Sequence, residues 1–158
     1  GRPLLTWPEA DRAPWGVIMM FGGGLALAAG MGASGFADWL GQELLPLQAA
    51  PLIVVALALT ALVVLVTEFA SNVATASAIM PVVASLAVAL GADPLLLAIP
   101  AAFAASWGFM LPAGTGPNAI AWATGRIRLS SMVRAGALLD IAGILLIVAV
   151  VWGVRAVA

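Results

Sequence analysis

The stretch LPAGTGPN, residues 111–118, decides how the rest of this sequence is interpreted. It holds two prolines, two glycines, one threonine and one asparagine, and helix-like apolar sequence lies on both sides of it. Proline removes a backbone donor and clashes with the preceding turn of a helix, while glycine weakens a helix. The stretch therefore predicts an unwound segment between two shorter helices.

The composition around this stretch is that of a membrane protein. Of the 158 residues, 64% are hydrophobic and 8% are charged, whereas a soluble domain is usually about 45–50% apolar and about 25% charged. In hydrocarbon an unsatisfied backbone N–H or C=O costs several kcal/mol, so unwound backbone is tolerated only against protein or a water-filled cavity. The interruption therefore indicates a functional site rather than a simple kink.

The residue types that the sequence lacks exclude several functions. The chain has no cysteine and no histidine, which excludes disulfides, thiolate metal sites and imidazole chemistry. Its net charge of -1 gives no electrostatic footprint for nucleic acid. A membrane-embedded enzyme ranks last among the hypotheses, because the few acids in the apolar segments also form no convincing catalytic pair. We therefore predict that the protein is not an enzyme, needs no cofactor and binds no nucleic acid.

At about 20 apolar residues for each span, the chain divides into seven units. These are a cytoplasmic loop (1–14), a transmembrane helix (15–31), an interfacial helix (34–47), an apolar pair of segments with a polar tip (49–90, tip at 67–73), a broken transmembrane helix (95–124, unwound at 111–118), a cytoplasmic loop (125–134) and a last transmembrane helix (135–157). Arginine favours cytoplasmic loops, and this division puts every arginine except Arg155 on one side. The N-terminal loop is then cytoplasmic and the C-terminus lies outside; the pair 49–90 is either two spans or a re-entrant hairpin.

The polar tip TEFASN, residues 67–72, is the second interruption. Ser71 and Asn72 are suited to cap the helix that follows. Glu68 is an ionisable group at membrane depth, which indicates a functional residue, unless it faces water or pairs with an arginine. Asp140, near the start of the last span, is interpreted as an acid that complements a helix dipole.

Two interrupted helices would expose free N–H groups that attract anions and free carbonyls that suit Na⁺. Discontinuous helices that meet near the middle of the bilayer are typical of binding sites in secondary transporters. The two interruptions therefore predict a shared site for an anion and a cation.

Three stretches also resemble the divalent anion:sodium symporters, in the C-terminal half of such a transporter. They are LTWPEADRAPWGVIMMFGGGLALA (5–28), TEFASNVATASAIMP (67–81) and FMLPAGTGPNAIAWATG (109–125). The resemblance implies an all-α membrane protein that forms one inverted-repeat half, with a re-entrant helical hairpin (49–90) and a broken transmembrane helix. It also implies a multi-pass protein of the cell membrane, a homodimer that works by an elevator motion, and the N-terminal half of the same transporter as a partner.

The resemblance assigns binding roles to residues of both interruptions. It implies that Ser71, Asn72, Val73, Thr115 and Gly116 bind the substrate, and that Thr67, Ala70, Asn72 and Gly114 bind Na⁺. Two positions depart from the family pattern: Val73 stands where threonine is expected, and Gly116 stands where proline is more usual. Both departures bear on which anion is bound.

The leading hypothesis is Na⁺-coupled transport of a small divalent anion such as a C4-dicarboxylate, citrate or sulfate. Two alternatives stay open. One is a related ion transporter of the arsenite/citrate or Na⁺/H⁺ type. The other is a non-transporting membrane scaffold subunit, in which the polar tips would pair with each other and leave no cavity.

Overall fold

The computed structural model describes residues 6–12, 15, 19, 22, 23, 26, 29, 30, 33–43 and 45–157, and in these ranges every regular element is a helix. Most of the predicted transmembrane helix 15–31, together with residues 1–5, lies outside the described residues. The described helices are α1 (Trp7–Ala10), α3 (Phe36–Glu43), the 3₁₀ helix η1 (Leu45–Ala49), α4 (Leu52–Thr67), α5 (Asn72–Ala89), α6 (Leu95–Ala104), α7 (Gly116–Ala123) and α8 (Leu129–Val157).

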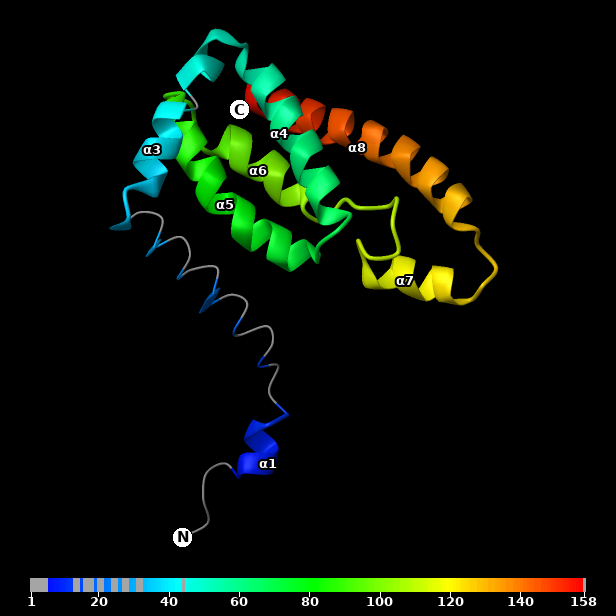
Figure 1. Ribbon diagram of the computed structural model, residues 1–158. Helices are drawn as coiled ribbons and strands as arrows, with labels where there is room; N and C mark the ends of the chain where they lie inside the picture. The colour runs from blue at the N-terminus through cyan, green and yellow to red at the C-terminus, as the bar shows by residue number, and fades with distance from the viewer. Residues whose placement is uncertain are drawn as a thin grey trace.

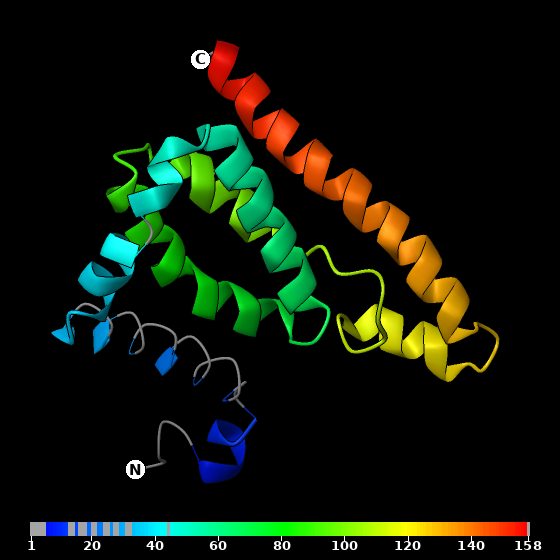
Figure 2. The same cartoon turned by 45° about the horizontal axis from the view of Figure 1, so that its top comes forward.

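Helix α6 lies at the centre of the packing. It contacts α4, α5 and α8, while α4 also packs on α8 and α3 packs on α5 (Figures 1 and 2). Small and branched apolar side chains allow this close packing: Ala56, Val63, Ala87, Leu97 and Ala101 are almost fully buried. Burial of such side chains is the main stabilising contribution inside the bundle.

The outer surface is apolar as well. Leu62 and Leu65 of α4 and Leu138 and Leu145 of α8 are each at least half exposed. Helices α5 and α8 are long and apolar enough to cross a membrane by length and composition, while α4 and α6 are shorter apolar helices. Apolar side chains directed outward are what a hydrocarbon environment favours.

Capping residues fix two of the helix ends. Ser71 is the N-cap of α5, as predicted, and its Oγ accepts a hydrogen bond from the Ala74 N–H at 3.2 Å. Gly91 follows α5 with a φ of 59°, and the Ala92 N–H donates to the Ala87 carbonyl at 3.0 Å. This is a glycine-terminated helix end, which residues with a Cβ rarely adopt, and the turn that follows leads the chain into α6.

Helix α8 starts at Leu129, N-terminal to the start of the predicted span at 135. Asp140 is therefore well inside the helix and not at its beginning, and its side chain is buried. The interpretation of Asp140 as an acid that complements a helix dipole was wrong, because that effect is confined to the first turn of a helix.

Candidate functional site

The turn between α4 and α5 lies against the non-helical segment that joins α6 to α7. Residues 67–72 and 105–115 are far apart in the sequence but lie side by side at the same end of the bundle (Figures 1 and 2). These are the two polar interruptions that the sequence singles out. We take their contact region as the candidate site.

Glu68 lies inside this contact region. Its side chain is fully buried, and its two carboxylate oxygens accept hydrogen bonds from the Met110 N–H at 2.8 Å and the Leu111 N–H at 2.6 Å. Within the described part of the chain, Glu68 therefore neither faces water nor pairs with an arginine, contrary to the two alternatives. The carboxylate instead satisfies two backbone donors that the interruption of the helix leaves without a helical partner.

The segment after α6 fits closely around Glu68. A Cβ atom at Gly114 would lie 3.3 Å from Glu68 Oε2, and a Cβ atom at Gly108 would lie 3.1 Å from Thr67 Cγ2. Because those separations are tighter than usual contacts, both positions favour glycine. The glycines of the interruption allow its backbone to approach the α4–α5 turn.

Four oxygen-bearing groups converge beside Glu68. The hydroxyl of Thr67 donates to the Ala105 carbonyl at 2.7 Å and lies 3.1 Å from the Asn72 amide. The same end of the Asn72 amide lies 3.2 Å from the carbonyl oxygens of Ala105 and Gly114. Thr67 has one hydroxyl proton, which it gives to Ala105, so the Asn72 group facing these oxygens is the amide nitrogen.

This arrangement has a consequence for cation binding. The Asn72 amide can present either its nitrogen or its oxygen to the same three groups. With the nitrogen inward it donates to oxygens of Thr67, Ala105 and Gly114. With the oxygen inward, four uncharged oxygen atoms would surround one point, which is a ligand set that suits a hard cation.

A third polar side chain holds the interruption in shape. Asn118 Nδ2 donates to the carbonyl oxygens of Gly108 at 3.1 Å and Leu111 at 3.2 Å. Thr115 is the N-cap of α7, where its Oγ1 accepts from the Asn118 N–H at 3.3 Å. The non-helical backbone is thus braced by side chains from α7.

The predicted site residues occupy different parts of this region. Of the predicted Na⁺ ligands, Thr67, Asn72 and Gly114 meet at one point, and Ala70 is half-buried in the turn. Of the predicted substrate residues, Ser71, Val73 and Gly116 are exposed at the starts of α5 and α7, and Thr115 is half-buried. The contact between Asn72 and Gly114 brings these two helix starts together.

Four participants were not predicted. They are the Ala105 carbonyl, the Met110 and Leu111 amides, and the Asn118 side chain. The first three are backbone groups of apolar residues, whose direction the residue type does not reveal. Asn118 was visible in the sequence as the last polar residue of the interruption.

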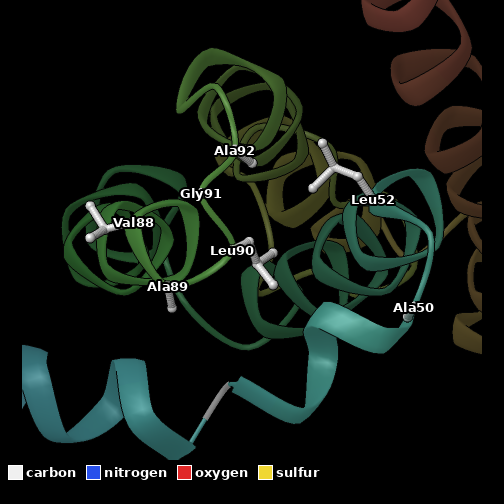
Figure 3. A pocket seen from close by; sticks show the side chains of 7 residues that line it. All are labelled: Ala50, Leu52, Val88, Ala89, Leu90, Gly91 and Ala92. Atoms are coloured by element: carbon white, nitrogen blue, oxygen red, sulfur yellow. The ribbon is translucent and has the colours of Figure 1, made fainter.

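A hollow of about 560 Å³ lies away from this region. Figure 3 shows it between the C-terminal end of α5, at Val88, Ala89 and Leu90, and the start of α4, at Ala50 and Leu52. Its side chains are apolar and carry no group that could recognise an ion. It is therefore not a candidate for the anion site.

Helical packing, an apolar outer surface and two polar interruptions that meet inside the bundle define a helical membrane protein. A profile of the sodium:sulfate symporter transmembrane region matches residues 2–157. The chain belongs to this family of sodium-coupled symporters.

Individual relatives agree with this assignment. The sodium-dependent dicarboxylate transporter SdcS of Staphylococcus saprophyticus is 45% identical over 149 residues, which are 94% of this chain and 29% of that protein. The Na(+)/dicarboxylate cotransporter 3 of Homo sapiens is 44% identical over 146 residues, 92% of this chain and 24% of that protein. All of these names are those of transporters, and the chain spans under a third of the length of the curated relatives it matches.

Proposed function

We propose that this chain forms part of a secondary active transporter that couples the movement of a small divalent anion to Na⁺. The substrate class is a C4-dicarboxylate, citrate or sulfate, and dicarboxylate is favoured because the most similar relatives are named for it. The observation that carries the proposal is the convergence of oxygen atoms from Thr67, Asn72, Ala105 and Gly114.

In this proposal the converging oxygens bind Na⁺. Rotation of the Asn72 amide replaces an internal hydrogen bond by a contact with the ion. The polar groups of the site therefore have partners both with and without Na⁺. The buried Glu68 carboxylate lies beside it and adds negative potential that favours a cation. Ala70, which is also expected at this site, would contribute through its carbonyl.

The anion would bind where α5 and α7 begin. Their N-terminal N–H groups and positive dipole ends favour a negatively charged ligand without a lysine or arginine. Ser71, Val73, Thr115 and Gly116 are at these helix starts. Because Na⁺ bound at Asn72 would lie next to the anion, each ligand would strengthen the binding of the other.

The remaining features of the proposal concern the complete transporter. The pair α4–α5 acts as a re-entrant hairpin and α6–α7 as a broken transmembrane helix of one inverted repeat, and the other repeat completes the site. The transporter is a homodimer that works by an elevator motion, with the N-terminal loop in the cytoplasm. In a scaffold subunit the two polar tips would also touch. Such a subunit would not be expected to belong to a symporter family or to bring four oxygen ligands together.

The deciding experiment measures uptake of labelled succinate, citrate and sulfate by the complete protein in liposomes, with Na⁺ or choline outside. We expect Na⁺-dependent uptake, which Asn72→Ala abolishes. Thr67→Val should raise the Na⁺ concentration needed for half-maximal uptake about tenfold, since it removes one ligand.

Thr60→Val is the matched control for Thr67→Val. Thr60 is a buried threonine of the same helix, but its hydroxyl donates to the Ala56 carbonyl of its own helix at 2.6 Å. Its Na⁺ dependence should equal that of the wild type. Uptake that does not depend on Na⁺, or equal effects of both valine substitutions, would contradict the proposal.

A further inference from the structure

A groove between α6 and α8 takes no part in the proposed transport site. Its volume is about 320 Å³, and most of its wall is apolar, with Leu95 and Phe103 of α6 on one side and Val150 and Val154 of α8 on the other. These four side chains are each more than half exposed. The groove therefore opens onto the apolar outer surface of the bundle.

One end of the groove is charged. Asp93, which precedes α6, and Arg155, in the last turn of α8, also line the groove and form an ion pair at 3.2 Å. Their side chains are 43% and 53% exposed. Asp93 is held in place because its Oδ1 accepts from the Leu95 N–H at 3.0 Å. The remaining N–H donors of the Arg155 guanidinium have no acceptor among the described residues, so the charged end can take a further partner.

The length of α8 places this charged end at the membrane surface. Arg134 and Arg155 are both exposed, and the helix between them rises about 32 Å. That length matches the hydrocarbon core of a bilayer, which is about 30 Å thick. Trp152, one turn before Arg155, is a residue type enriched at the membrane–water interface. The ion pair then lies at the level of the lipid headgroups, and the groove extends from it into the hydrocarbon.

The dimensions of the groove suit a single hydrocarbon chain. From Leu95 to Phe103 the helix rises about 12 Å, so the volume corresponds to a cross-section of about 27 Å². A helix with its side chains is about 10–12 Å wide, which is too wide to enter. Empty space between apolar side chains loses dispersion contacts, and lipid tails are as apolar as leucine. An acyl chain of the bilayer therefore fits this groove, and a second helix does not.

We propose that the groove binds one acyl chain of a bilayer phospholipid, whose phosphate contacts Arg155 and whose amine contacts Asp93. A guanidinium group binds phosphate oxygens through parallel N–H donors, and a carboxylate accepts hydrogen bonds from an ammonium group. The two charges of the ion pair thus match the two charges of a zwitterionic headgroup. The lipid joins the start of α6 to the end of α8, independently of whether the protein transports an anion.

The type of amine matters in this arrangement. The primary amine of phosphatidylethanolamine can donate hydrogen bonds to Asp93, whereas the quaternary amine of phosphatidylcholine has no N–H group. Phosphatidylglycerol has a phosphate for Arg155 but no amine at all. The structure therefore favours phosphatidylethanolamine over both other lipids.

The test is titration of the delipidated complete protein in detergent with each of these three lipids, followed by native mass spectrometry. The wild type should bind phosphatidylethanolamine most tightly. Arg155→Gln should weaken this binding about tenfold, because hydrogen bonds to a charged group are lost. Asp93→Asn should remove the preference for phosphatidylethanolamine over phosphatidylglycerol. A wild type that binds phosphatidylglycerol at least as tightly as phosphatidylethanolamine would overturn the proposal.

Two matched controls separate this groove from other lipid contacts. Arg134→Gln changes an exposed arginine of the same helix outside the groove and should bind lipid as the wild type does. Val150→Trp should fill the groove from an exposed position and exclude the acyl chain, whereas Leu138→Trp, exposed on α8 but outside the groove, should have no effect. Equal losses in either pair would overturn the proposal. So would a wild type that binds no lipid, since another segment of the complete transporter would then cover the groove.

Discussion

At the scale of single residues, Glu68 explains how non-helical backbone can exist inside the bundle. The break after α6 leaves N–H groups without helical acceptors, and in an apolar environment each such group costs several kcal/mol. One carboxylate satisfies two of them, at Met110 and Leu111. The acid of one interruption therefore stabilises the other interruption.

Glu68→Gln should test this role. Glutamine keeps the shape but presents one carbonyl oxygen and one NH₂ group, so one of the two amides would face a donor. We expect a loss of stability of about 1–3 kcal/mol, measured as a lower melting temperature of the complete protein in detergent. Glu43→Gln, at an exposed position of α3, is the control and should have no effect; equal melting temperatures for both variants would contradict the role of Glu68.

Val73→Thr should test the substrate side of the proposed site. Val73 is exposed in the first turn of α5, where a hydroxyl group could donate to a bound anion. Hydrogen bonds to charged groups contribute about 1.5–3 kcal/mol, so the KM for dicarboxylate should fall about tenfold. The Na⁺ dependence should stay unchanged, and an altered Na⁺ dependence with an unchanged KM would place Val73 outside the anion site.

At the scale of elements, small residues set the distance between α8 and the segment after α6. A Cβ atom on Gly136 would overlap the backbone of Phe109 and Met110, and one on Gly143 would overlap the Trp107 indole. Trp107 Nε1 also donates to the Leu139 carbonyl at 3.2 Å. Close approach through small residues is the usual way in which membrane helices associate, and here it places α8 directly against residues 107–110.

Gly136→Ala should therefore separate α8 from the segment. The neighbours of Gly136 are backbone atoms that cannot rotate away, so we expect a destabilisation of about 1–3 kcal/mol, seen in thermal unfolding of the complete protein. Gly153→Ala is the control on the same helix, because a Cβ there meets nothing within 4 Å. It should be neutral or stabilising by up to about 1 kcal/mol, since alanine favours a helix; an equal loss in both would refute the packing argument.

The elements also show what the sequence could predict. Composition and apolar runs indicated a helical membrane protein, and the unusual residues at 67–72 and 111–118 located the two regions that meet. The start of α8 could not be inferred, because Arg128, Ser130 and Arg134 indicate contact with water but do not prevent a helix. The partners of Glu68 could not be inferred either, since they are backbone amides of apolar residues.

At the scale of the whole molecule, the two ends of the bundle differ in chemistry. One end holds the buried side chains of Thr67 and Glu68 and the half-buried amide of Asn72. The other end carries the exposed ion pair of Asp93 and Arg155 and the apolar hollow of Figure 3. Because exposed ion pairs contribute little to stability, ions should affect the molecule mainly through the polar end.

Na⁺ should therefore stabilise the complete protein in the absence of any substrate. A ligand that binds only the folded state adds about 2.7 kcal/mol of stability at a concentration one hundred times its Kd. We expect the melting temperature in detergent to rise with Na⁺ at constant ionic strength, with choline as the replacing cation. Thr67→Val should remove most of this rise while Thr60→Val preserves it, and a rise of the same size in choline, or in both variants, would mean that the four oxygen atoms do not bind Na⁺.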